Sequence, residues 1–195
     1  MQVTKAWPAV AVTVLAVAAG NAASAPTKTS AKRSAAKAAR REAVRRREGR
    51  QLLRKILVEQ KETWRWQWIM GRTPTRQSDS GAHINGLGYR RRMLDLWARR
   101  ASDARRRAKH PPHLSAWLCI HRYEGSWTDD GAPYYGGLQM DLGFQSTYGR
   151  TLLQRKGTAN HWTPLEQMWV AERAYRSGRG FYPWPNTARW CGLIG

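Results

Sequence analysis

Acidic residues are scarce in this chain of 195 residues, which has 13 Asp and Glu against 34 Lys and Arg. The shortage is uneven, because residues 26–109 carry 25 basic and seven acidic side chains whereas residues 111–195 carry eight and six. The first segment is therefore strongly cationic and the second is nearly neutral. A cationic segment of this kind is attracted to polyanions, which include nucleic acids, anionic membranes and anionic cell-wall polymers.

The residue spacings typical of metal sites are also missing. The chain has five His and two Cys, and none of them forms a Cys-x-x-Cys or His-x-x-x-His pair. Cys119 and His121 lie close together in the sequence but are too few to hold a zinc ion. We therefore predict neither a metal site nor a cofactor.

The N-terminus lacks an apolar run long enough to cross a bilayer comfortably. Its apolar segment, AVAVTVLAVAA (residues 9–19), is too short for that. The segment follows Lys5 and precedes the small residues GNAASA (20–25), which is the layout of a secretory signal peptide. We predict that residues 1–25 are a signal peptide, cleaved after Ala22 or Ala25, and that the protein is secreted or associated with the cell wall. An uncleaved N-terminal anchor is the alternative.

Only two cysteines are present, and their placement supports export. Cys119 and Cys191 lie 72 positions apart, near the two ends of the neutral segment. In an oxidising compartment they would pair and close this segment into one domain. We therefore predict a disulfide between them.

The cationic part, residues 26–110, is predicted to be a partly helical extension. Its Ala-, Lys-, Ser- and Thr-rich start, residues 26–40, is typical of a flexible tether. Apolar residues recur at helical spacings from about residue 35 to residue 70, and again over residues 89–110, opposite many arginines. Two basic amphipathic helices are therefore expected.

The neutral part, residues 111–195, is predicted to be a small, mainly α domain. Helices are expected over residues 114–124 and 138–148, and from Thr163 to Gly178, where Thr163, Pro164 and Glu166 form a capping box. Two Trp fall on predicted buried stripes and two fall in loops, where a Trp can stack on a sugar ring. The buried ones are Trp117 and Trp169, and the loop ones are Trp127 and Trp184.

The stretch CIHRYEGSW, residues 119–127, holds the candidate for acid chemistry. Glu124 lies in the last turn of the first predicted helix of this domain, between Tyr123 and Gly125. The negative end of the helix dipole and partial burial against Trp127 would both favour its protonated form, as a proton donor requires. A surface carboxylate paired with Arg122 is the simpler interpretation of the local sequence.

Further motifs follow Glu124 in a specific order. They are YYGGLQM (134–140), QSTY (145–148), EQMWVAERAY (166–175) and PWPNTARWCG (183–192). With YEGSW, this series resembles the catalytic domain of the resuscitation-promoting factors of actinobacteria, over roughly residues 112–193. The resemblance implies a small lysozyme-like or transglycosylase-like domain that cleaves peptidoglycan.

The resemblance also implies roles for individual residues. Glu124 matches the catalytic acid, and Gln139 and Thr147 match polar residues that line the glycan groove. Tyr135 and Trp127 are carried over as further substrate-binding residues. The chain departs from the family in two places. Cys119 lies five positions before Glu124 instead of directly before it, and three extra residues separate Gln139 from the QSTY segment.

A glycosidase with two carboxylates needs a second Asp or Glu facing the acid. Asp129 and Asp130 belong to a DDG turn signal, and Asp141 lies two residues after Gln139, so on a helix it would point elsewhere. The sequence therefore favours a single acid, Glu124, which cleaves the MurNAc–GlcNAc backbone by a lytic transglycosylase or substrate-assisted route. Hydrolysis stays open.

Two other functions compete with this prediction. A non-catalytic peptidoglycan-binding module could use the same fold, and the extension could make the chain a basic nucleic-acid-binding protein. Export argues against nucleic acid as the partner. The partners we expect are peptidoglycan strands for the domain, and anionic wall polymers or a membrane surface for residues 26–110.

Overall fold

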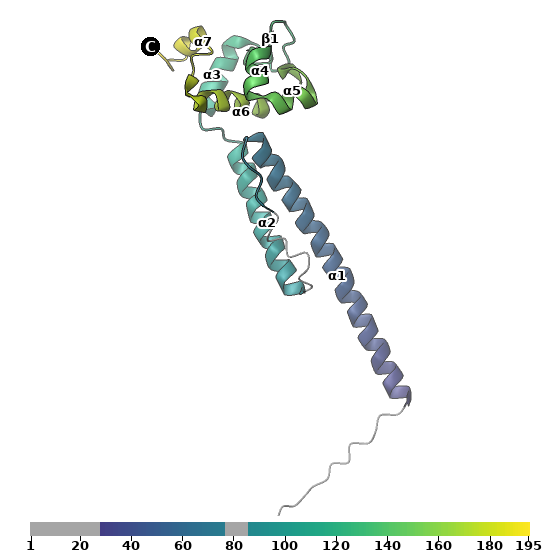
Figure 1. Cartoon of the computed structure of the whole chain (residues 1–195). Helices are drawn as coiled ribbons and strands as arrows, with labels where there is room; N and C mark the ends of the chain where they lie inside the picture. Colours follow the sequence, from purple (N-terminus) through teal and green to yellow (C-terminus); the bar gives the residue numbers. More distant parts are fainter. Residues whose placement is uncertain (1–27, 77–85) are drawn as a thin grey trace, which may run out of the picture. The chain divides into compact units, whose positions relative to one another are not determined.

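The computed structural model describes residues 28–76 and 86–195, so the predicted signal peptide, residues 1–25, lies outside the described residues. The described part is mainly helical, as predicted, and its elements are labelled in Figure 1. The chain divides into two compact units between Glu42 and Ala43. Every candidate site residue belongs to the second unit, residues 43–195.

The first helix, α1, runs over Lys28–Ile69 and begins earlier than the sequence suggested. The prediction of a flexible tether over residues 26–40 is wrong from Lys28 onward. The side chains of residues 28–40 are all exposed, so packing does not impose this helix. The physical reason is composition, because Ala, Lys and Arg are among the strongest helix formers.

The second basic helix, α2, runs over Leu87–Ala108 and packs beside α1. The Trp64 and Trp97 rings meet edge to face, with their centroids 6.2 Å apart. Nearer the start of α2, Arg91 forms an ion pair with Glu48. Along the part of α1 in the second unit, the contacts move to higher residue numbers in both helices, from Glu48 with Arg91 to Trp64 with Trp97, so α2 runs in the same direction as this part of α1 (Figure 1).

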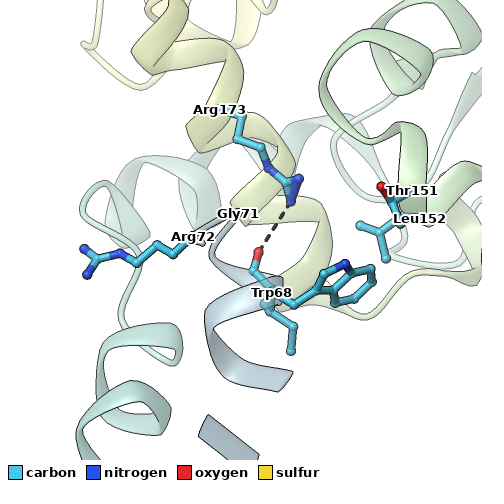
Figure 2. Close-up of a pocket in the computed structure, with 7 residues that line it drawn as sticks. Trp68, Gly71, Arg72, Thr151, Leu152 and Arg173 are labelled. Carbon is cyan, nitrogen blue, oxygen red and sulfur yellow. Dashed lines mark hydrogen bonds between the residues drawn. The ribbon is translucent and has the colours of Figure 1, made fainter. Parts of the chain in front are cut away.

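The C-terminal ends of α1 and α2 share a small core with helix α6, Pro164–Ala174. Trp169 of α6 is 2% exposed, and its indole N–H donates to the carbonyl oxygen of Ala108 at 2.7 Å. Arg173 donates to the carbonyl oxygen of Ile69 at 3.4 Å, as Figure 2 shows, and to that of Tyr148 at 3.1 Å. One face of α6 is thus committed to the two basic helices.

The main core lies within residues 111–195. It is formed by α3 (Leu114–Glu124), α4 (Leu142–Tyr148), α5 (Arg150–Lys156), α6 and α7 (Pro185–Trp190). A 3-10 turn at Ala159–His161 precedes α6, and a π turn at Tyr175–Arg179 follows it. The predicted capping box of α6 is confirmed, with Thr163 and Glu166 bonded reciprocally. Trp117 and Trp169 are buried as predicted, and Trp184, at 4% exposure, is also a core residue.

A short antiparallel hairpin carries the YYGGLQM segment. Strand β1, Tyr134–Tyr135, pairs with strand β2, Met140–Asp141. The helix predicted over residues 138–148 is therefore wrong at its start, because α4 begins only at Leu142. Asp141 caps α4 by accepting a hydrogen bond from the Phe144 amide at 2.6 Å, which separates the strand from the helix.

The predicted disulfide between Cys119 and Cys191 is confirmed, with an S–S distance of 2.03 Å. It joins α3 to the end of α7. A disulfide is consistent with an extracellular protein. No helix within residues 28–76 and 86–195 combines the length and apolar character needed to cross a bilayer.

Candidate functional site

Glu124 is the last residue of α3 and is partly exposed. One of its carboxylate oxygens accepts a hydrogen bond from the Thr187 hydroxyl at 2.7 Å. Thr187 is itself 5% exposed, so this bond fixes the carboxyl group from its buried side. Among the described residues Glu124 forms no ion pair with Arg122, which is exposed. The carboxyl group is therefore held in place while keeping access to solvent.

Helix α7 supplies Thr187, and two contacts hold this helix against α3. The first is the disulfide from Cys119 to Cys191, whose Cα atoms lie 6.0 Å apart. The second is an edge-to-face contact between Tyr123 and Trp190, with centroids 5.4 Å apart. Neither Thr187 nor Trp190 was predicted from the sequence as a residue near the acid. The spacing could have indicated Thr187, because it precedes Cys191 by one helical turn and therefore lies on the same face of a helix as the cysteine that is bonded to α3.

Gln139 lies against the residue that follows Glu124. A β-carbon added at Gly125 would lie 3.4 Å from Gln139 Nε2 and 3.3 Å from Asp129 Oδ2. The Gln139 amide nitrogen donates to Asp129 at 2.7 Å and to the carbonyl oxygen of Gly136 at 3.1 Å. Both bonds use Nε2, and Oε1 has no hydrogen bond to any residue that the structure describes. The amide is thus oriented with its acceptor oxygen left for a ligand.

Two of the three aspartates considered as a second carboxylate, Asp129 and Asp141, accept hydrogen bonds from backbone amides. Asp129 accepts from the Gly131 amide at 3.1 Å, which makes it the turn former that the DDG signal predicted. Its other oxygen is taken by Gln139. Asp141 caps α4, and Asp130 is exposed in the same turn as Asp129. None of the three is positioned by a contact with Glu124.

The two glycines of YYGGLQM allow a close approach of side chains that belong to the domain itself. A β-carbon at Gly137 would lie 2.6 Å from His121 Nδ1 and 2.8 Å from a ring carbon of Trp127. His121 and Trp127 are stacked there with centroids 3.9 Å apart. At Gly136 a β-carbon would lie 2.5 Å from the side-chain oxygen of Gln167. Trp127 is consequently half-buried, with one ring face already occupied.

Gly136→Ala is expected to destabilise the domain by about 2–4 kcal/mol. Gly136 has φ of 75°, which costs about 1–2 kcal/mol for a residue with a β-carbon, and the clash with Gln167 adds to it. Gly178→Ala is the matched control, because its φ is 97° but nothing lies within 4 Å of its β-carbon position. Urea unfolding measures both, and equal losses would contradict the steric part of this prediction.

Tyr135 and Thr147 complete the predicted binding residues. Tyr135 is half-buried in β1 opposite Met140 and packs against the main core. Thr147 is exposed on α4, and its hydroxyl donates within that helix to the carbonyl oxygen of Gly143 at 2.8 Å. The structure thus brings Gln139 to the end of α3 beside Glu124, while Thr147 stands on a separate helix.

Buried polar side chains that were not predicted from the sequence hold these segments together. Gln167 is fully buried, accepts from the Gly137 amide at 2.9 Å and donates to the carbonyl oxygen of Trp127 at 2.8 Å. Glu172, also fully buried, accepts from the Trp117 indole at 2.9 Å. Glu172 lies four residues after Met168 and so falls on the predicted apolar stripe of this helix. A polar residue on such a stripe indicates a buried side chain that bonds other parts of the domain.

No group of three or more His, Cys, Asp or Glu that could hold a metal ion occurs in the part of the chain that the structure describes. No family model, no curated protein and no solved structure matches this chain. The resemblance of residues 112–193 to a known catalytic domain therefore rests on the motifs themselves.

Proposed function

We propose that the protein is a secreted enzyme that cleaves the glycan backbone of peptidoglycan, with a lysozyme-like domain in residues 111–195. The observation that carries this proposal is the environment of Glu124. Its carboxyl group is partly exposed and accepts a hydrogen bond from the hydroxyl of Thr187. The next residue, Gly125, packs against the side-chain amide of Gln139. A carboxylic acid held in a fixed position can donate a proton to a glycosidic oxygen, and the nearby Gln139 Oε1 can accept a hydrogen bond from a sugar hydroxyl.

In the proposed reaction Glu124 donates its proton to the glycosidic oxygen as the bond from this oxygen to the sugar C1 breaks. The resulting carboxylate then takes a proton from the nucleophile. If the nucleophile is the C6 hydroxyl of the same sugar, the product carries a 1,6-anhydro end and no water is consumed. If it is water, the product has a reducing end.

The structural roles of the aspartates support the route with a single acid. Asp129 bonds Gly131 and Gln139, and Asp141 caps α4, so each of these two carboxylates already has a structural role. A substrate group that acts as nucleophile removes the need for a second carboxylate. We therefore favour the anhydro product.

Substrate binding in this proposal uses the surface around α3 and α7. Gln139 Oε1 accepts a hydrogen bond from the sugar, and Trp127 and Tyr135 contribute further contacts, while Thr147 adds a contact from α4, outside this surface. Tyr123 and Trp190 add an exposed aromatic pair on the same two helices, being 50% and 64% exposed. Aromatic faces of this kind are suited to packing on sugar rings.

That exposed aromatic pair also favours a second candidate, a peptidoglycan-binding module without catalysis. Incubation of the full chain with purified peptidoglycan separates the two functions. We expect soluble muropeptides, with anhydro ends detected by mass spectrometry. Binding to the sacculus with no soluble product would support the binding module and refute the enzyme.

Thr187→Val is expected to lower kcat for muropeptide release about tenfold and to leave KM nearly unchanged. The change keeps the side-chain shape but removes the hydrogen bond to Glu124, and an ordinary hydrogen bond is worth up to about 1.5 kcal/mol, which is about tenfold in rate. Thr187→Ser restores the hydroxyl and should restore most of the rate. A Ser variant as slow as the Val variant would show that Thr187 matters only for packing.

A further inference from the structure

A cationic groove lies outside the candidate glycan site, where the ends of α1 and α2 meet α6. It consists of two adjoining cavities of about 510 and 110 Å³, which share Met70, Arg72 and Arg107. We call it the arginine groove and define it by five of its lining residues. These are Arg72, Arg100, Arg106, Arg107 and Arg176.

The charges that line the arginine groove are poorly balanced. Among the described lining residues Asp103 is the only carboxylate, and it is shared by Arg106 and Arg107, with an Arg107 contact of 2.8 Å. Arg176 lies 3.9 Å from Glu172, whose carboxylate already accepts bonds from His113 and Trp117. At least two positive charges therefore lack a counterion among the described lining residues.

One guanidinium group of the groove, that of Arg100, lies 4.8 Å from the centroid of the Trp97 ring and also has an unused donor. Nη1 of Arg100 is buried and has no hydrogen-bond partner among the described residues, although guanidinium N–H groups are strong donors. The pKa of a neighbouring arginine, Arg173, also reflects the crowding of positive charge. Burial lowers the pKa of the Arg173 guanidinium below its usual value, and the positive charge of Arg176 lowers this pKa further.

We propose that the arginine groove binds the phosphate groups of an anionic polyol-phosphate polymer. Guanidinium groups bind phosphate oxygens in pairs of parallel hydrogen bonds, and five of them along one groove suit a repeating phosphodiester better than a single small anion. The choice of a wall polymer rests on the proposed function, whereas the phosphate site rests only on the groove. Its role would be to hold the enzyme near its substrate while the glycan site works elsewhere on the surface.

The aromatic lining of the groove argues against single-stranded nucleic acid. Proteins that bind single strands stack bases on exposed aromatic rings. Among the described lining residues the aromatic rings are Trp169, which is 2% exposed with Arg176 over its ring at 5.3 Å, and the imidazole of His110, which is exposed and contacts the carbonyl oxygen of Arg106 at 2.8 Å. The groove therefore offers many charges and donors but only one small exposed ring among these residues, which does not suit a series of stacked bases.

The test uses the full chain and labelled poly(glycerol phosphate), with binding followed by fluorescence anisotropy over a series of salt concentrations. Arg72→Gln combined with Arg107→Gln should weaken binding at least about tenfold and lower its salt dependence. Arg99→Gln combined with Arg150→Gln is the matched control. Both arginines are exposed and lie outside the groove, and the two substitutions remove the same charge as those at Arg72 and Arg107. The control should retain nearly full affinity.

Each other outcome has a definite meaning. Equal losses in the two double variants would overturn the site, since diffuse charge would then explain binding. Tighter binding to a short DNA duplex or to phosphatidylglycerol vesicles than to the polymer would overturn the ligand class. Glu124→Gln should bind the polymer as well as the wild type does, so a failure of glycan cleavage with groove binding intact would refute only the proposed function.

Discussion

Replacing Glu124 with Gln is expected to slow muropeptide release from purified peptidoglycan by about a thousandfold. General acid catalysis typically contributes a factor of about 100 to 10,000, and the amide cannot donate the required proton. Gln has the same shape and can still bond the Thr187 hydroxyl, so the fold should be unaffected. Release is measured as soluble reducing and anhydro sugar under conditions where the wild type is linear in time.

Asp129→Asn is the matched control for the single-acid mechanism. It removes the carboxylate nearest to the end of α3 but retains an oxygen that can accept from the Gly131 amide. We expect a loss of activity below about tenfold, caused by the weaker hold on Gln139, and the same anhydro product. A loss as large as that of Glu124→Gln would show that two carboxylates take part. Equal activity of Glu124→Gln and wild type would refute the enzymatic proposal.

Removing the disulfide is expected to destabilise residues 43–195 by about 4 kcal/mol and to lower the Tm by about 10 °C. The cysteines are 72 positions apart, and the chain-entropy model gives about that free energy for a loop of this length. Calorimetry of Cys119→Ser, Cys191→Ser and the double variant measures it. The three variants should melt alike, because each lacks the same bond.

The same variants should also lose activity, at temperatures well below their unfolding transition. The disulfide holds α7 against α3, and this contact brings Thr187 to Glu124. We expect the activity loss to resemble that of Thr187→Val, with kcat affected more than KM. Full activity in the folded double variant would show that the Tyr123–Trp190 contact alone keeps the two helices in register.

Local features of the fold could be predicted from the sequence where neighbouring residues determine them. The capping box at Thr163 and the stop of α3 at Gly125 both depend on contacts within one turn, and both are confirmed. The disulfide could be predicted because the chain has two cysteines, which allow one pairing. The helix at Lys28 was missed because a composition of Ala, Lys and Ser fits both a tether and an exposed helix.

Contacts between distant residues could not be predicted in this way. The bond from Thr187 to Glu124 joins residues 63 positions apart. The arginine groove combines arginines of the turn after α1, of α2 and of the π turn that follows α6, none of which is unusual in its own segment.

The sequence by itself determined the cationic and neutral halves, the helices α2, α3 and α6, and the identity of the candidate acid. The tertiary structure alone decided which side chains surround that acid and where unbalanced charge collects. The physical reason is that capping, periodicity and turn formation act within a few residues. Hydrogen bonds such as that of Thr187, and the meeting of arginines from three segments, exist only once the helices have packed.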